Sequence, residues 1–228
     1  MRLIQLARLL GAAAVGVVLA GAPINLPLAA ADPCPEVDVV FARGTNEPPG
    51  LGPTGESFLA ALRTQLGGKT VGVYPVNYPA TTEFSTGVDG IRDASAHVID
   101  MAKSCPNTKM VLGGFSQGAA VMGFVTTDKV PDALPDSIDP GNLPKPMSPD
   151  VAKHVAAVAL FGEPSSQFMK TIGQPAITVG PLYAAKTIRL CADGDVVCSE
   201  DGGDFATHDT YPINGMTTQA ASFASSKL

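Results

Sequence analysis

The strongest constraint on the fold is a regular alternation between short apolar runs and longer stretches with helical spacing. Strands are predicted for the apolar runs 37–42, 70–76, 111–112, 155–161 and 187–190. Helices are predicted where apolar residues recur at helical intervals, over 56–66, 88–103, 117–127 and 215–227. Strands that alternate with helices form a mainly parallel sheet, and near-continuously apolar strands indicate that both faces of that sheet are covered. We therefore expect a doubly wound α/β fold.

A glycine-rich turn follows the third predicted strand. The sequence over 113–118 is GGFSQG, in which Ser116 lies between two glycines in the pattern Gly-x-Ser-x-Gly. In hydrolases built on a parallel sheet, this pattern forms a sharp turn from strand to helix that exposes the serine hydroxyl. A side chain at either glycine is expected to collide with the neighbouring strand or helix. Ser116 is therefore the candidate nucleophile.

A nucleophilic serine needs a base that takes its proton, and the chain has three histidines to supply one. His97 lies inside the predicted helix 88–103, and His154 comes directly before a buried strand. His208 follows all the predicted strands and lies in a loop. Because such sheets place the serine, the acid and the histidine in that order along the chain, we predict that His208 is the base.

The carboxylate that orients the histidine is expected in the loop after the last strand. Four acidic residues of this region are candidates: Asp193, Asp195, Asp201 and Asp204. A cysteine pair at 191 and 198 brackets the first two, and it would hold one of them rigidly, as an orienting carboxylate requires. Spacing alone leaves Asp193 and Asp195 as alternatives.

Residues 1–31 have the features of a signal peptide. Two arginines lie around the start of an apolar core at 9–22, and small residues lead up to a cleavage site at Ala31. Two prolines and an asparagine over 23–27 interrupt the apolar stretch and disfavour a retained membrane anchor. We expect an exported protein, extracellular or associated with the cell envelope, in which 32–228 form a single domain.

The charge balance argues against nucleic acid as a partner. Without the expected signal peptide the chain keeps 13 basic and 21 acidic side chains, which is a net charge of −8. No cluster of lysine and arginine occurs in the sequence. Nucleic acids and anionic membrane surfaces both favour basic patches.

Four cysteines lie in the expected mature chain, at Cys34, Cys105, Cys191 and Cys198. An even number of cysteines in an exported protein predicts two disulfides, with three possible pairings. A metal site is disfavoured because the closest cysteine pair has no histidine near it in a ligand pattern. We expect neither a metal nor a cofactor.

A proline-rich segment at 128–150 interrupts the alternation of strands and helices. Six prolines exclude a regular helix or a central strand there. Two interpretations remain open: a passive surface connection, or a loop that borders the substrate site.

Several sequence blocks together resemble the cutinases, which are small secreted serine esterases. The resemblance is strongest to the cutinase-like proteins of mycobacteria and related actinobacteria. The blocks are DPCP at 32–35, VVFARGT at 39–45, GGFSQG at 113–118, FGEP at 161–164, and the late cysteine pair followed by His208. They span nearly the whole expected mature chain, and their joint occurrence is far more specific than any one block.

The resemblance implies a three-layer fold, with a five-stranded, mainly parallel sheet between two layers of helices. It also implies a catalytic triad of Ser116, Asp195 and His208. Asp195 is preferred to Asp193 because the acid of the family lies four residues after the first cysteine of the late pair. The implied oxyanion hole consists of the backbone N–H of Gln117 and the hydroxyl of Thr45.

The family also pairs its cysteines in a way that selects one of the three possibilities. The resemblance implies the disulfides Cys34–Cys105 and Cys191–Cys198. The chain departs from compact fungal cutinases in two respects: segment 128–150 is longer, and the sequence has no tryptophan. An open site without a lid, and cutin as a substrate, therefore do not follow from the resemblance.

The predicted function is hydrolysis of carboxylic esters, from lipids or short-to-medium acyl chains, through an acyl-enzyme. One alternative is an acyltransferase that uses the same triad with a lipid or sugar hydroxyl as acceptor. Another is a non-catalytic surface antigen or binding protein, which an intact triad disfavours. The expected partner is an ester or lipid substrate. We expect a monomer that makes transient contact with lipid or cell-envelope surfaces.

Overall fold

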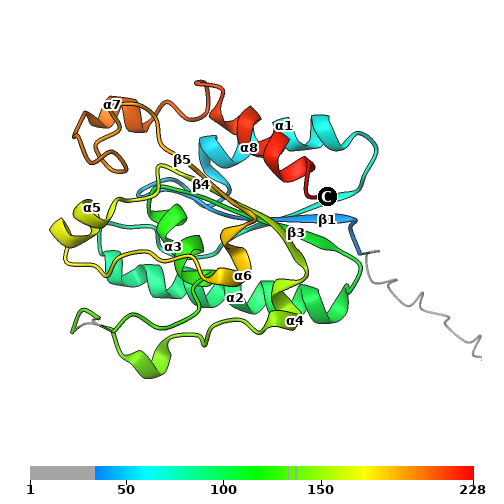
Figure 1. Ribbon diagram of the computed structural model, residues 1–228, viewed down its shortest axis with the longest axis horizontal. Coiled ribbons are helices and arrows are strands. Elements are labelled where there is room, and N and C mark those ends of the chain that lie inside the picture. Colours follow the sequence, from blue (N-terminus) through cyan, green and yellow to red (C-terminus); the bar gives the residue numbers. More distant parts are fainter. Residues whose placement is uncertain (1–33, 133, 137) are drawn as a thin grey trace, which may run out of the picture. The chain divides into compact units, whose positions relative to one another are not determined.

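Five parallel strands form one sheet in the computed structural model, which describes residues 34–132, 134–136 and 138–228 (Figure 1). The strands are β1 (Val37–Ala42), β2 (Val71–Pro75), β3 (Lys109–Phe115), β4 (Val155–Phe161) and β5 (Thr187–Leu190). Their order across the sheet is β2-β1-β3-β4-β5, and every neighbouring pair is parallel. The expected signal peptide lies outside the described residues. Within the described residues, no helix is long and apolar enough to cross a membrane.

Helices cover both faces of the sheet, as the apolar strands predict. In Figure 1, α1 (Gly52–Leu66) and α8 (Met216–Ser225) lie above the sheet, and α2 (Gly87–Ser104) and α3 (Gln117–Val125) lie below it. Side chains alternate along a strand, so that Val40 of β1 packs in one apolar core and Phe41 in the other. The three-layer αβα architecture is therefore confirmed.

Most predicted element bounds agree with the structure to within one or two residues, and the main differences are in β3 and at the start of α1. The bounds of β1, β4 and β5 agree with the predicted runs, whereas β3 continues to Phe115 through two glycines that carry no strand signal. Helix α1 begins four residues before the predicted start at 56, because Pro53 occupies its first turn, where a missing N–H costs nothing. Four helices of four to six residues lack a periodic pattern in the sequence: α4 (Pro149–Ala152), α5 (Ser166–Thr171), α6 (Pro181–Ala184) and α7 (Phe205–His208).

The proline-rich segment 128–150 runs alongside α2 and then returns to the core. Arg92 on α2 donates a hydrogen bond from Nη2 to the backbone oxygen of Asn142 over 3.0 Å. Near the end of the segment, Met147 is buried in the core on the α2 side of the sheet. The expectation that the segment holds no regular helix is wrong at its end, where α4 starts at Pro149, a favourable first helical position for proline.

Both disulfides implied by the resemblance are present. Cys34–Cys105 joins the chain before β1 to the residue that follows α2, and it closes a loop with a sequence separation of 71. Cys191–Cys198 closes a small ring directly after β5, with a sequence separation of 7. The first therefore ties distant parts of the fold together, and the second fixes one loop.

Candidate active site

Ser116 lies on the sharp turn between β3 and α3. Its backbone has φ 55° and ψ −120°, which is a rare conformation for a residue with a side chain. The N–H of Ser116 donates to the oxygen of Phe161 at the end of β4 over 2.9 Å, and this bond holds the turn against the sheet. Rare backbone conformations of this kind cluster at active sites, where the surrounding structure enforces them. The turn has the conformation that the Gly-x-Ser-x-Gly pattern predicts.

Close backbone contacts explain both glycines of the turn. A Cβ at Gly114 would lie 2.2 Å from the backbone oxygen of Gly118 in α3. A Cβ at Gly118 would lie 2.0 Å from the backbone oxygen of Ala42 at the end of β1. Neither backbone atom can move away as a flexible side chain could. The two glycines therefore allow the serine turn to pack tightly between the sheet and its helix.

His208 and Asp195 form a buried pair beside this turn. Nδ1 of His208 lies 2.8 and 2.9 Å from the two carboxylate oxygens of Asp195, whose side chain is fully buried. The ring of Phe115 stacks on the imidazole at 4.8 Å between centroids. Nε2 of His208 is buried and has no hydrogen-bond partner among the described residues. One ring nitrogen is thus bound by the acid, and the other is left for a ligand or a reacting proton.

A tyrosine that no sequence motif marks completes the surroundings of Asp195. The Tyr211 hydroxyl donates to Oδ2 of Asp195 over 2.6 Å and accepts a hydrogen bond from the N–H of Ala192 over 3.0 Å. The N–H of Val197 donates to Oδ1 of Asp195 over 2.8 Å. Burial and the bond to Asp195 raise the pKa of the Tyr211 hydroxyl, so it remains a proton donor. The carboxylate is therefore fixed by three separate partners, counting His208.

These hydrogen bonds determine the charge of Asp195. Burial by itself raises the pKa of its carboxyl group, because it disfavours the charged form. The hydrogen bonds from His208, Tyr211 and Val197 outweigh burial and bring the pKa below its ordinary value. Asp195 therefore stays ionised at neutral pH, as a group that must orient and stabilise an imidazolium requires.

The other acids and histidines considered from the sequence lie elsewhere. Asp193, the alternative to Asp195, is exposed and makes no hydrogen bond to His208. Asp201 is exposed, and Asp204 accepts the N–H of Thr207 as the N-cap of α7. His97 pairs with Asp38 over 2.8 Å and stacks on Tyr74. His154 comes just before β4, at the end of the sheet opposite Ser116.

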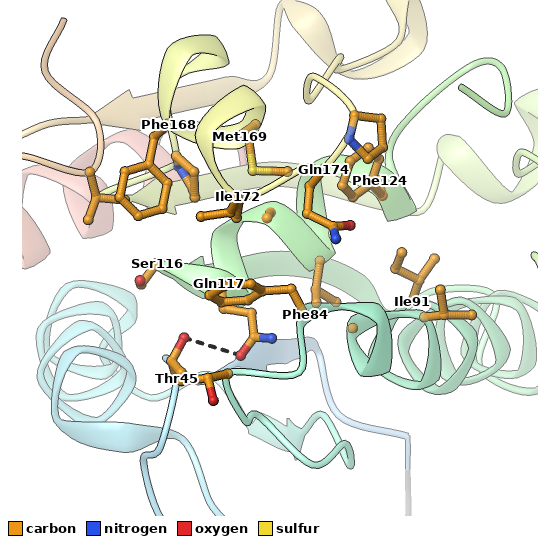
Figure 2. Close-up of a pocket in the computed structure, with 18 of the residues that line it drawn as sticks. Thr45, Phe84, Ile91, Ser116, Gln117, Phe124, Phe168, Met169, Ile172 and Gln174 are labelled. Carbon is orange, nitrogen blue, oxygen red and sulfur yellow. Dashed lines mark hydrogen bonds between the residues drawn. The ribbon is translucent and has the colours of Figure 1, made fainter. Parts of the chain in front are cut away.

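Thr45 and Gln117 face each other beside Ser116 (Figure 2). The Thr45 hydroxyl donates to Oε1 of Gln117 over 3.3 Å, and Nε2 of Gln117 donates to the oxygen of Thr81 over 3.1 Å. Gln117 is the first residue of α3, so its backbone N–H has no partner within the helix. The structure thus places both residues of the expected oxyanion hole next to Ser116.

The loop that carries Thr45 is held by a neighbouring arginine and glutamate. Oε2 of Glu47 accepts the N–H of Gly44 over 2.6 Å, and Nε of Arg43 donates to the backbone oxygen of Glu47 over 2.7 Å. Arg43 is buried and also donates to the oxygen of Tyr78 over 2.7 Å. Sequence reasoning missed this support, although Arg43 stands in one of the blocks that carry the resemblance.

An apolar pocket of about 400 Å³ opens beside Ser116 and His208. Figure 2 shows Ser116 on one side of the pocket and Ile91 and Phe124 on the other. The proline-rich segment 128–150 contributes Val130, Pro131, Leu134, Ile138, Leu143 and Pro144 to the wall. Of the two interpretations of this segment, the structure therefore favours the loop that borders the site.

Comparisons with known proteins agree with this geometry. The family model described as Cutinase matches residues 33–228. The "Probable carboxylesterase Culp5" of Mycobacterium tuberculosis is 57% identical over 173 residues, which cover 76% of this chain and 96% of that protein. The "Carboxylesterase Culp1" of Mycobacterium bovis is 46% identical over 228 residues, covering 98% of this chain and 96% of that protein.

A solved structure extends the agreement to the fold. The cutinase of Trichoderma reesei, in complex with a phosphonate inhibitor, is 32% identical with a TM-score of 0.60, and the match covers 85% of this chain and 76% of that one. Fold and site together define an α/β-hydrolase that acts as a serine ester hydrolase. The chain belongs to the cutinase family.

The two disulfides are expected to have different effects when removed. On the chain-entropy model, closing a loop of about 70 residues contributes roughly 4 kcal/mol to the free energy of unfolding, and a ring of about 7 residues roughly 2.4 kcal/mol. Replacing Cys34 and Cys105 by alanine should therefore lower the melting temperature more, while the folded fraction keeps its activity.

Removing the Cys191–Cys198 disulfide should mainly lower kcat, with a smaller effect on the melting temperature. Asp195 lies inside the ring closed by Cys191 and Cys198, and it must hold His208 to within a fraction of an ångström. The double alanine variant of the small ring should lose kcat by at least about tenfold at a temperature where it remains folded. The measurement is activity per folded molecule, with circular dichroism as the folding control. Full activity in this variant would show that Tyr211 and Val197 suffice to hold the carboxylate.

Proposed function

We propose that this protein is an exported esterase that hydrolyses carboxylic esters through an acyl-enzyme formed on Ser116. The observation that carries the proposal is the state of the His208 ring. One nitrogen is bound by the ionised Asp195, and the other is buried and unpartnered among the described residues, in a side chain that lines the same pocket as Ser116. An imidazole held in this way is suited to take a proton from a serine hydroxyl.

The proposed reaction uses residues of this chain at each step. The Ser116 hydroxyl attacks the ester carbonyl carbon while Nε2 of His208 takes its proton, and Asp195 stabilises the resulting imidazolium. The carbonyl oxygen becomes an oxyanion that the N–H of Gln117 and the hydroxyl of Thr45 stabilise. For this, the Thr45 hydroxyl must turn from Oε1 of Gln117 to the substrate. Each such donor contributes roughly 3 kcal/mol to stabilising the transition state.

The remaining steps release the alcohol and then the acid. The leaving alkoxide takes the proton from Nε2 of His208, which leaves an acyl group on Ser116. His208 then takes a proton from a water molecule as the water oxygen attacks the acyl carbon. It gives this proton to Oγ of Ser116 as the bond between Oγ and the acyl carbon breaks, which restores the free serine and the neutral imidazole. The acid product leaves with one oxygen from water.

The pocket provides room for the acyl half of the substrate. The leaving oxygen must lie against His208, so the acyl half must extend in the other direction. That direction leads into the apolar wall formed by Phe84, Ile91, Phe124 and residues of segment 128–150. Burial of each methylene there is worth up to about 0.8 kcal/mol. The proposed substrates are therefore esters with an apolar acyl chain.

Product analysis tests hydrolysis against acyl transfer. Turnover of p-nitrophenyl butyrate in water should release nitrophenol and butyric acid in equal amounts, preceded by a burst if the acyl-enzyme accumulates. The same reaction is then run with dilute glycerol as an acceptor. If glycerol esters form in place of free acid at low acceptor concentration, the protein is an acyltransferase.

Export is supported by the chemistry of the cysteines. Both pairs form disulfides, and such bonds persist in oxidising compartments outside the cytoplasm. We propose that 1–31 act as a cleaved signal peptide. Mass spectrometry of the protein from culture medium should find an N-terminus at Asp32, and a retained N-terminal segment would contradict this.

Narrowing the far side of the pocket should change the preference for acyl length. Ile91 lies on the opposite side of the pocket from Ser116 (Figure 2). Ile91→Phe should lower kcat/KM for p-nitrophenyl octanoate by about tenfold, and leave p-nitrophenyl acetate within about twofold, because the added ring occupies space that only the longer chain needs. The measurement is kcat/KM across acetate, butyrate, hexanoate and octanoate.

A matched control lies two turns further along the same helix. Ile99 on α2 is exposed and does not line the pocket. Ile99→Phe should leave the whole length profile unchanged. Equal losses on short and long esters in Ile91→Phe would contradict the assignment of this wall to the acyl chain.

A further inference from the structure

The charged groups of the pocket are unevenly distributed. Among its lining residues in the described part of the chain, those that can carry a charge are Glu47, His208 and Asp209, and none is a lysine or an arginine. Most of the remaining wall is apolar. A substrate group placed near these residues therefore meets two carboxylates and no permanent cation.

Both carboxylates lie on the His208 side of the pocket. Asp209 follows His208 directly in the chain and is exposed. Burial raises the pKa of Glu47, and the hydrogen bond from Gly44 and the charge of Arg43 partly offset this effect. Glu47 is also close enough to Asp209 and His208 for their charges to act on it. The hydrogen bond from the N–H of Gly44 fixes the Glu47 carboxylate in this position.

Neither carboxylate is neutralised by an ion pair in the described residues. Neither Glu47 nor Asp209 lies within 4.0 Å of a basic side chain in an ion pair of the described residues. The nearest cation, Arg43, directs its guanidinium to backbone oxygens, those of Glu47, Tyr78 and Pro79. The charge of Arg43 offsets part of that of Glu47, but Arg43 does not line the pocket, and Asp209 has no cation within 4.0 Å in the described residues. The His208 side of the pocket therefore keeps a negative field, to which Asp209 contributes in full and Glu47 in part.

The chemistry of the reaction determines whether the alcohol half or the acyl half of the ester lies near Glu47 and Asp209. The leaving alkoxide must take its proton from Nε2 of His208, which is more than nine-tenths buried and unpartnered among the described residues. The alcohol half must therefore lie beside His208, and so beside Glu47 and Asp209. The acyl half extends away from them.

We propose that the alcohol half of the substrate is uncharged or cationic, and that Glu47 and Asp209 discriminate against esters of anionic alcohols. This inference rests on the proposed ester hydrolysis at Ser116. It narrows the substrate class to acyl esters of neutral alcohols, such as polyols, or of alcohols that carry an ammonium group. Esters whose alcohol half carries a sulfonate or phosphate are expected to be poor substrates.

Three butyrate esters that differ in the charge of the alcohol test the proposal. Choline butyrate is cationic, neohexyl butyrate has the same shape without the charge, and sulfopropyl butyrate is anionic. At low salt, kcat/KM should fall by about three- to tenfold at each step in this order, a range typical of charges a few ångströms apart near a protein surface. Added sodium chloride should narrow the differences.

A pair of variants separates the local field from the net charge of the protein. Asp209→Asn should reduce the ratio of kcat/KM for choline butyrate to kcat/KM for sulfopropyl butyrate by about threefold or more. The ratio is the readout because a change next to His208 can alter all three rates together, and the ratio cancels that effect. Asp201→Asn removes the same charge from an exposed residue outside the pocket and should leave the ratio unchanged.

The outcomes distinguish this inference from the proposed function. Neohexyl butyrate hydrolysis that is lost in Ser116→Ala supports the function by itself, whatever the charge dependence. With that established, equal kcat/KM for the three esters, or a ratio that Asp209→Asn leaves unchanged, would overturn the inference. Hydrolysis that persists in Ser116→Ala would instead overturn the function.

Discussion

Ser116→Ala should lower kcat for ester hydrolysis by at least about 10⁴-fold while the protein remains folded. In the proposed mechanism this hydroxyl supplies the atom that bonds to the acyl carbon, and among the described residues no other serine lines the pocket. The loss should appear in kcat, because the apolar wall that binds the substrate is unchanged. The measurement is the rate on p-nitrophenyl butyrate, with the melting temperature as the control for folding.

A second serine variant provides a matched comparison. Ser222 is exposed on α8 and does not line the pocket. Ser222→Ala should keep the full rate. A Ser116→Ala variant that retains near-normal turnover would show that the nucleophile lies elsewhere.

His208→Ala should be about as damaging as Ser116→Ala. Without the imidazole, the serine proton has no acceptor, and Asp195 is too far along the chain of hydrogen bonds to replace it. The effects of substituting residues that act as one unit do not add. The double variant, with alanine at both 116 and 208, should therefore be little slower than either single variant. Rates of the three variants on one short ester, measured at one pH, test this expectation.

The other two histidines serve as controls with different expected effects. His97→Ala should leave kcat within a fewfold but lower stability, because it leaves the nearly buried carboxylate of Asp38 without its partner. His154→Ala should also leave kcat nearly unchanged, since His154 lies at the opposite end of the sheet. If either variant loses more activity than His208→Ala, the assignment of the base is wrong.

The layers of the fold could be predicted because they depend on local pattern. Strand β4 is a continuous apolar run with clear ends, so its bounds follow from the sequence, and the bounds predicted for the shorter mixed run 187–190 also agree with β5. The end of β3 could not be predicted in the same way, because its two glycines have no strand preference. They belong to the strand because Gly113 packs under Phe41, and Gly114 under α3, which are tertiary contacts.

The candidate site was predictable where chain order and family spacing limit the choice. Ser116 follows from the glycine pattern, and His208 from its place after the last strand. The choice of Asp195 over Asp193 rested on the resemblance alone. The structure agrees with it, because Asp195 is buried against His208 and Asp193 is exposed.

The support around the site could not be predicted, because it consists of contacts between distant segments. Tyr211 binds Asp195 across 16 residues of chain, and nothing in its local sequence marks it. The same holds for Arg43, which binds the oxygen of Tyr78 across 35 residues. Such hydrogen bonds become visible only when the fold has brought the segments together.

Covalent labelling tests the central claim most directly. The protein is incubated with an alkyl p-nitrophenyl phosphonate, and the site of modification is then located by peptide mass spectrometry. We expect one phosphonyl group per molecule, attached to Ser116, with matching loss of esterase activity and no labelling of Ser116→Ala. Stoichiometric inactivation with the label on any other residue, or labelling that leaves activity intact, would contradict it.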